Sequence, residues 1–365
     1  MLSTESLRHW LRLTLVPGIG SETQRKLLQR FGLPELVFST SRSELRDVIG
    51  DRLASALLET DNSDLVQTAC DWSTQDNQHV VTLADSEYPQ ALLEISDPPT
   101  LVYVRGRLEL LNRPALAIVG SRNPTPQGVQ NAERFAAAFA GAGLVIASGL
   151  ALGIDAAAHR GALAAGGDTV AFIGTGIDRI YPARNRELAL DIGAKGTIVS
   201  EFPIGTPVTA FNFPKRNRLI SGLSRGVLVV EAAIESGSLI TARLAGEQGR
   251  EVFAIPGSIH SPQARGCHAL IKQGAKLVET AQDVLEELRW GHVAPTSAPT
   301  REGADASAGQ HDLLAIMGFD PCGLDDLVGR SGLTADALSV MLLHLELDGH
   351  IASLPGSRYQ RLAQT

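Results

Sequence analysis

Short apolar runs alternate with helix-like stretches between residues 76 and 290. Seven continuously apolar runs can be read there: 116–119, 144–146, 170–173, 198–199, 227–230, 252–255 and 277–278. Strands that are buried on both faces of a parallel sheet have this continuous rather than alternating pattern. Helical patterns such as AERFAAAFAGAG lie between the runs. The alternation predicts an α/β domain with a Rossmann-like, doubly wound, mostly parallel sheet.

Residues 1–75 have a different pattern, in which leucines such as Leu7, Leu11 and Leu15 recur at helical spacing. The segment VPGIG at 16–20 is followed by SETQRKLLQRFG, for which Ser21 is a plausible N-cap. We expect a small helical domain of the SAM-like or helix-hairpin-helix-like type. A helix-hairpin-helix element can hold a DNA phosphate through its backbone amides. A glycine-rich turn that only packs two helices together explains the same residues.

The C-terminal part divides into a linker and a second small domain. Residues 291–310 are rich in Ala, Ser, Thr, Pro and Gly and predict a flexible linker. Residues 311–365 predict three short helices and two strands, which suggests a winged helix. Seven acidic residues stand there against three arginines. Because binding to duplex DNA depends on neutralising phosphates, we expect this domain to contact protein rather than DNA.

Composition limits the function classes only loosely. The 365-residue chain is 44% hydrophobic and carries a formal charge of −8, so any anion site must be a local concentration of cations. Cys70, Cys267 and Cys322 lack metal-ligand spacing, and we expect reduced thiols and no metal. The start of the chain does not resemble a signal peptide, and no apolar stretch reaches roughly 18–20 residues. These features predict a cytoplasmic protein with no contact to a membrane.

Glycines and small polar residues follow most of the predicted strands. Ligands of open α/β sheets bind beyond the carboxyl ends of the strands, where glycines allow close approach and helix N-termini face anions. The candidates for phosphate contact are Gly120, Ser121, Arg122, Gly149, Gly237 and Ser238. Tight turns alone explain many of the glycines, but not Arg122. The patterns G-x-G-x-x-G and G-x-x-x-x-G-K-[ST] are both missing from the expected places, which disfavours a dinucleotide site and a P-loop.

The segment 211–225 concentrates positive charge without an acidic residue. Its cations are Lys215, Arg216, Arg218 and Arg225, and two phenylalanines precede them, Phe211 and Phe213. Aromatic faces beside closely spaced cations suit unstacked bases on a phosphate chain. On a helix beginning near Pro214, Lys215 and Arg218 share one face and Arg216 points elsewhere. We expect Phe211 in the core, whereas core and site are equally open for Phe213.

These motifs resemble the DNA-processing protein A family (DprA, also called Smf) of bacterial recombination mediators. The matching stretches run in order through about 115–280: IVGSRNPTPQG, IASGLALGIDAAAHRGAL, FIGTGIDRIYPARNREL, IVSEFPIGTPV, FPKRNRLISGLS, VVEAAIESGSLITARLAGEQGREVFAIPGS and GCHALIKQGAKLV. The resemblance implies a homodimer without enzymatic activity or a cofactor. It also implies binding of single-stranded DNA, protection of that strand and loading of RecA onto it during natural transformation.

Carried onto this chain, the resemblance assigns two groups of residues. The residues implied to contact single-stranded DNA are Gly120, Ser121, Arg122, Phe213, Lys215, Arg216, Asn217 and Arg218. Ile271 and Leu277, in HALIKQGAKLV, occupy the apolar positions implied for self-association. Ordinary core positions explain these last two residues as well.

Two alternatives belong to other function classes. Nucleotide phosphoribohydrolases resembling the lysine-decarboxylase-like family share this sheet type and carry a P-G-G-x-G-T turn followed by a glutamate. The comparable turn here is ESGSLITAR, with Ala242 and Arg243 where a carboxylate is needed. Glu201 and Glu231 are conceivable general bases, but no partner group lies near either in sequence. The second alternative is an interaction protein in which the basic segment is incidental.

Overall fold

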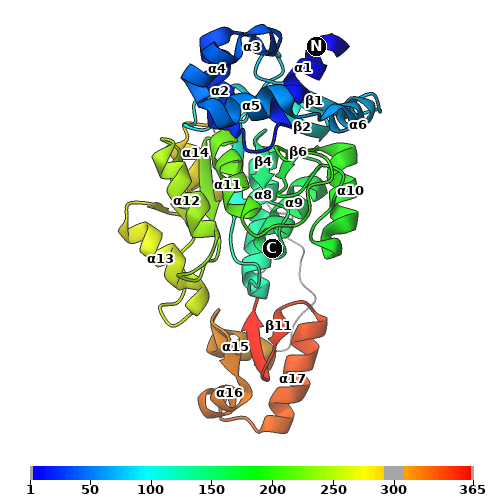
Figure 1. The fold of residues 1–365 in the computed structure, drawn as a ribbon. Coiled ribbons are helices and arrows are strands. Elements are labelled where there is room, and N and C mark those ends of the chain that lie inside the picture. The colour runs from blue at the N-terminus through cyan, green and yellow to red at the C-terminus, as the bar shows by residue number, and fades with distance from the viewer. Residues whose placement is uncertain (1–2, 292–307, 363–365) are drawn as a thin grey trace.

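The computed structural model describes residues 3–291 and 308–362. Its central sheet has nine strands: β1 Gln78–Thr82, β2 Leu101–Gly106, β3 Ala115–Val119, β4 Val145–Ser148, β5 Thr169–Phe172, β6 Thr197–Ser200, β7 Gly226–Val229, β8 Glu251–Ala254 and β9 Lys276–Leu277. Their order across the sheet is β1-β2-β6-β5-β4-β3-β7-β8-β9 (Figure 1). The strands from β6 to β9 in this order pair in parallel, and β1 and β2 add an antiparallel edge beside β6.

Helices precede the sheet and cover it. The N-terminal ones are α1 Thr4–Thr14, α2 Ser21–Phe31, α3 Pro34–Ser39, α4 Arg42–Ile49, α5 Asp51–Glu59 and α6 Ser63–Ser73. Those that alternate with the strands are α7 Gln90–Leu93, α8 Pro126–Gly141, α9 Ile154–Ala164, α10 Arg186–Lys195, α11 Asn212–Leu223, α12 Ser238–Glu247, α13 Arg265–Lys272 and α14 Ala281–Glu287. Three short 3₁₀ turns lie at 108–112, 183–185 and 262–264.

The side chains of β3 show why the domain has three layers. Successive side chains of a strand point to opposite faces. Ala117 and Val119 accordingly pack with residues of α7, α11, α12 and α13, whereas Leu116 and Ile118 pack with residues of α8, α9 and α14. Every residue of this strand is buried. The predicted Rossmann-like, mostly parallel fold is therefore confirmed.

Two details of the N-terminal half differ from the sequence expectation. The strands β1 and β2 were not among the predicted runs. In β1, an edge strand that pairs only with β2, the polar residues of QHVVT interrupt the apolar pattern. Ser21 is not the N-cap of α2. Gly20 occupies that position, and the Ser21 hydroxyl instead donates to Asp97, 2.8 Å away, in the segment before β2.

The C-terminal domain is a winged helix, as expected. It consists of α15 Ala308–Met317, β10 Cys322–Gly323, α16 Leu324–Ser331, α17 Ala335–Leu347, β11 Ile351–Leu354 and β12 Arg358–Arg361. It lies at the opposite end of the molecule from α1–α5 (Figure 1). The Gln360 amide donates to the Gln127 side chain of α8 at 3.0 Å, which places β12 beside the central domain. Residues 292–307 of the predicted linker lie outside the described residues, and residues 308–310, predicted as the end of the linker, belong to α15.

None of the helices in the described ranges is both long and apolar enough to cross a membrane.

Candidate functional site

The order in which strands are added to the sheet reverses between β3 and β7. After β3 the chain builds β4, β5 and β6 on one side of that strand, and β7 then starts the other side. Crevices for ligands open beyond the carboxyl ends of the strands at such a switch point. A cavity of about 710 Å³ lies there, lined by the turn after β3, the start of α11 and the loop before α12. We call it the switch-point pocket.

Arg122 comes from the turn after β3 and is exposed in the pocket. It makes no salt bridge with any residue that the structure describes. Its guanidinium carbon lies 5.7 Å from the centre of the Phe213 ring. The Phe213 ring in turn lies 5.8 Å from the ring of Tyr181, tilted by 39°. A cation over an aromatic face is thus available beside a second ring, the combination that binds a phosphate and a base together.

Arg216 is buried on the floor of the same pocket. Its Nη1 donates to the carbonyl oxygen of Gly149 at 2.6 Å and also to that of Phe172. Its Nε donates to Asn217 at 3.2 Å. Burial, which disfavours the charged form, lowers the pKa of Arg216 to about 10. The guanidinium therefore stays charged at neutral pH, and the backbone carbonyls hold it in a fixed position.

Gly149 makes room for this arginine. A Cβ atom built on Gly149 would lie 2.6 Å from both terminal nitrogens of Arg216, closer than any side chain tolerates. The amide of Gly149 donates to Asp155 at 3.1 Å, so it has no free N–H for a phosphate. Gly149 is also outside the lining of the pocket. In this structure its part is to support Arg216.

Asp155 in the first turn of α9 is a pocket residue that the sequence did not single out. It is buried and accepts hydrogen bonds from the amides of Gly149 and Ala151. Desolvation raises the pKa of Asp155, while the charge of Arg216 and the two amides act in the opposite direction. The GID triplet after β4 was visible in sequence, but nothing local indicated that an arginine 61 positions later would face it.

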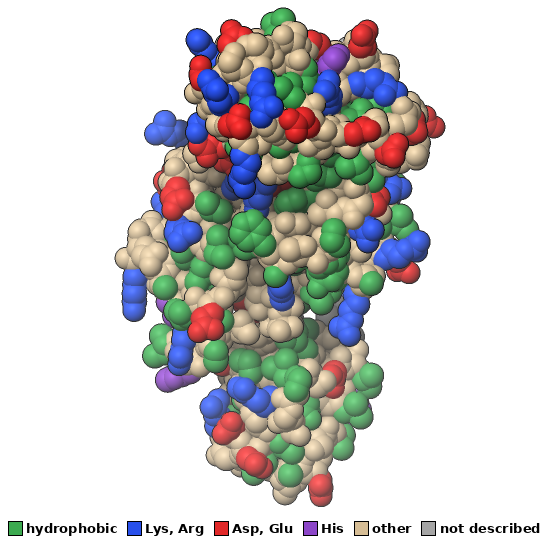
Figure 2. All heavy atoms as spheres, in the orientation of Figure 1, with side chains coloured by type: hydrophobic (Ala, Val, Ile, Leu, Met, Phe, Trp, Pro, Cys, Tyr) green, Lys and Arg blue, Asp and Glu red, His purple; other side chains and the backbone are tan. Residues whose placement is uncertain are grey.

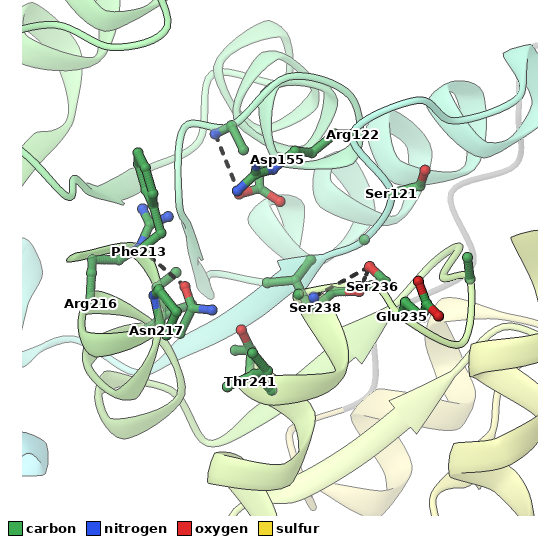
Figure 3. A pocket seen from close by; sticks show the side chains of 18 of the residues that line it. Ser121, Arg122, Asp155, Phe213, Arg216, Asn217, Glu235, Ser236, Ser238 and Thr241 are labelled. Carbon is green, nitrogen blue, oxygen red and sulfur yellow. Dashed lines mark hydrogen bonds between the residues drawn. The ribbon is translucent and has the colours of Figure 1, made fainter. Parts of the chain in front are cut away.

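The loop before α12 forms the opposite wall of the pocket. Figure 3 shows Ser236 and Ser238 across the pocket from Phe213, Arg216 and Asn217. The hydroxyls of the two serines lie 2.7 Å apart, and the amide of Ser238 donates to Ser236. Gly237, the N-cap of α12, has open space around it. Hydroxyls and the amides at the start of a ten-residue helix suit phosphate oxygens.

The structure brings eight of the predicted residues to this pocket. They are Gly120, Ser121, Arg122, Phe213, Arg216, Asn217, Gly237 and Ser238. Phe211, expected in the core, is 77% exposed at the start of α11, where the chain runs over the surface before it turns into the helix. Tyr181 lies in the stretch FIGTGIDRIYPARNREL, and the sequence predicts no role for it. Its ring is an unpredicted wall of the pocket.

Lys215 and Arg218 do not line the pocket. They share a face of α11, as the helical spacing predicts, but that face meets two carboxylates. Arg218 binds Glu201 through two contacts of 2.6 and 3.1 Å, and its Nε donates to Asp97 at 3.1 Å. The Nζ of Lys215 lies 3.9 Å from Glu201. Both Arg218 and Glu201 are buried, so this charge is compensated inside the protein.

Asp97 extends this group to the N-terminal helices. Arg25 of α2 donates to Asp97 at 2.7 Å, and Ser21 donates to the same carboxylate. Desolvation alone raises the pKa of Asp97, but the hydrogen bonds from Arg25 and Ser21 and the charge of Arg218 hold that pKa below its usual value. Arg218, Asp97 and Arg25 therefore link the start of α2 to α11. We call them the α2–α11 ion bridge.

The two glutamates considered as general bases have structural partners. Glu201 is paired with Arg218, as described above. Glu231 accepts hydrogen bonds from the amide and the hydroxyl of Thr125, the N-cap of α8. Neither glutamate lines the switch-point pocket. Desolvation raises the pKa of Glu231.

The two residues implied for self-association lie at the far edge of the sheet. Leu277 belongs to β9, the last strand in the sheet order, and is 45% exposed. Ile271 lies on α13 and is half-buried against the core. An edge strand with an exposed leucine offers unpaired backbone groups to another chain.

Comparisons with known proteins place the chain in a family. The model of DNA recombination-mediator protein A matches residues 79–289, and a DprA winged-helix model matches residues 297–357. Protein Smf of Escherichia coli is 43% identical over 85% of this chain and 84% of its own length. The DNA processing protein DprA of Streptococcus pneumoniae is 49% identical over 57% of this chain and 74% of its own.

Two solved structures agree with this assignment. The X-ray structure of DprA from Streptococcus pneumoniae covers 78% of this chain and 98% of its own, with 38% identity and a TM-score of 0.69. A structure of DNA processing protein A from Helicobacter pylori, described as giving insight into its single-stranded DNA binding mode, covers 57% of this chain and 95% of its own, with 32% identity and a TM-score of 0.53. This chain belongs to the DNA recombination-mediator protein A family.

Proposed function

We propose that this chain binds single-stranded DNA in the switch-point pocket. The observation that carries the proposal is the position of Arg122 and Arg216 in one pocket, with the Phe213 ring beside them. The exposed guanidinium of Arg122 offers a contact to a phosphate, the buried Arg216 adds positive charge at the floor of the pocket, and the ring offers a face to an unstacked base. The likeness to the Helicobacter pylori protein, whose structure is described as showing a single-stranded DNA binding mode, supports the same ligand.

The shape of the site favours an unpaired strand. Phe213 and Tyr181 form part of a concave wall, and a base reaches a ring inside a pocket only when it is released from its partner strand. Ser236 and Ser238 face them with hydroxyls that suit phosphate or sugar oxygens. Lys215 and Arg218 are not part of the proposed site, because they lie outside the pocket lining and their charges pair with Glu201.

A titration of labelled oligothymidine followed by fluorescence anisotropy tests this proposal. We expect affinity for the single strand to exceed that for a duplex of equal length, and to fall linearly on a log–log plot against salt concentration. Equal or tighter binding of the duplex, or no binding of either, would overturn it.

We further propose that the protein acts as a homodimer that protects the bound strand and helps to load RecA onto it, as in the uptake of DNA during transformation. The membership in a family of recombination mediators supports this role. The exposed Leu277 on the edge strand supports the dimer. An assay of RecA filament growth on oligothymidine, with and without the protein, tests the loading step. Filament growth that is unchanged by the protein would contradict it.

A further inference from the structure

Helix α17 of the winged helix is apolar on two faces. One face packs Leu338, Leu342 and Leu345 into the core of the domain, where all three are buried. A second face carries Val340, Leu343 and Leu347, which are 57%, 55% and 75% exposed. We call these three residues the α17 stripe. A surface helix needs only one apolar face to fold, so the stripe is not required by the domain's own core.

The α17 stripe has the spacing of a helix-packing seam. Val340, Leu343 and Leu347 follow one another at intervals of three and then four residues, which places them along a single line of the helix. Figure 2 shows hydrophobic side chains gathered on the face of the winged helix that α17 forms in Figure 1. Scattered single leucines on a surface are ordinary, but an aligned set on one helix indicates a contact site.

The charges around the stripe select the partner. Lysine and arginine are absent from α17, whereas Asp336 lies in its first turn and Asp348 is its C-cap, both exposed. Two of the domain's arginines are engaged within it: Arg358 donates to the Pro321 carbonyl, and Arg361 donates to Leu314 and lies over Phe319. Helix α17 itself therefore presents an apolar stripe with an aspartate near each end.

We propose that the α17 stripe is a docking surface for an amphipathic helix of a partner protein, with leucines along one line and Lys or Arg beside them. Apolar side chains on such a helix cover the stripe, and its cations meet Asp336 and Asp348. A second copy of α17 brings the same acidic groups together, and like charges oppose that pairing. Nucleic acid finds no cation on this helix. The inference does not depend on the DNA pocket.

A synthetic peptide of the same length as α17, 13 residues, tests the proposal with the full chain. The labelled peptide carries leucines at the seam spacing and lysines beside them. Two control peptides have the lysines replaced by glutamates and the same composition in scrambled order. We expect the lysine peptide to bind at least about ten-fold more tightly than either control by fluorescence anisotropy, a difference of about 1.4 kcal/mol.

Paired variants localise the binding. Changing Leu343→Gln and Leu347→Gln together should abolish binding of the lysine peptide. The matched control changes Leu36→Gln and Leu65→Gln, two exposed leucines on α3 and α6, and should bind the lysine peptide as the parent does.

The proposal is overturned if the glutamate or scrambled peptide binds as tightly as the lysine peptide, or if the α17 variant keeps the parental affinity for the lysine peptide. It is also overturned if the lysine peptide fails to bind, or if sedimentation shows that the α17 variant dissociates an oligomer, since a second copy would then occupy the stripe.

Discussion

Arg216 donates a hydrogen bond of 2.6 Å to the carbonyl oxygen of Gly149, although 67 positions separate the two residues. The contact joins α11 to the turn after β4 and fixes a buried cation at the floor of the switch-point pocket. Arg122, from the turn after β3, supplies the exposed cation of the same pocket. The proposed DNA site therefore combines a buried guanidinium with an exposed one.

Replacing Phe213 should weaken binding of single-stranded DNA. In a Phe213→Ala variant the base loses its stacking partner, which costs about 1–3 kcal/mol of binding free energy. The matched control is Phe211→Ala, because Phe211 is nearby in sequence but lies outside the lining of the pocket. Anisotropy titrations with oligothymidine compare the two. An equal loss in both variants would contradict the placement of the base against Phe213.

Replacing Arg218 should affect stability more than DNA binding. Arg218→Ala leaves Glu201 buried without its partner and breaks the α2–α11 ion bridge, which should lower the free energy of unfolding by about 3 kcal/mol. Hydrogen exchange should increase in α2 and α11. The salt dependence of oligothymidine binding should stay as in the parent. A flatter salt dependence with unchanged stability would instead place Arg218 on the DNA.

Much of the fold could be predicted from the sequence because parallel strands that are buried on both faces appear in it as continuous apolar runs. Arg122 and Phe213 were also accessible, since each follows a strand end or precedes a cluster of cations. The functions of Lys215 and Arg218 were not accessible in the same way. Their segment contains no acidic residue, but Glu201 and Asp97 reach them from other parts of the chain. Charge that is uncompensated along the sequence can be compensated in space.

Asp155 and Tyr181 illustrate the same limit. Each stands among glycines or prolines in a motif that the sequence shows clearly, yet their roles depend on which loop faces them after folding. Phe211 is the opposite case. Hydrophobicity predicted burial, whereas the chain before α11 runs over the surface and leaves this ring 77% exposed. Local patterns define the elements, and the order of the strands decides which of their ends meet.

A charge on the edge strand should produce a monomer. Leu277→Asp places a carboxylate in the contact that we propose for the dimer, next to backbone groups of β9. Analytical ultracentrifugation should show half the parent's mass at micromolar concentration, with weaker binding of long oligothymidines. The equivalent change at another exposed leucine, Leu190→Asp on α10, should leave the mass unchanged. A Leu277→Asp dimer of parental stability would count against this edge.

Buried His159 should make the protein sensitive to acid. Its Nδ1 lies 2.7 Å from Thr169, and burial, helped by the charges of Arg216 and Arg160, lowers the pKa of His159 from 6.5 to about 3. Below pH 6.5 the unfolded chain binds a proton that the folded protein excludes, so stability falls as pH drops from 6.5 towards 3. The slope is up to about 1.4 kcal/mol per pH unit.

Urea unfolding of the parent and of His159→Asn between pH 7 and pH 4 measures this contribution. The variant should show a shallower loss of stability over that range, whereas His344→Asn, at an exposed position of α17, should follow the parent. Identical slopes for the parent and His159→Asn would contradict this, because they would mean that the folded protein binds the His159 proton as readily as the unfolded chain does.

The most direct test of the DNA site is the salt dependence of oligothymidine binding by Arg122→Ala. The matched control is Lys195→Ala, an exposed cation at the end of α10 just before β6, at the N-terminal ends of the parallel strands, whereas the pocket lies beyond their carboxyl ends. If Arg122 holds a phosphate, its variant binds more weakly and the slope of log affinity against log salt decreases in size by about 0.7, while Lys195→Ala keeps the parental slope. Arg122→Ala with parental affinity and slope would contradict the assignment of the switch-point pocket to single-stranded DNA.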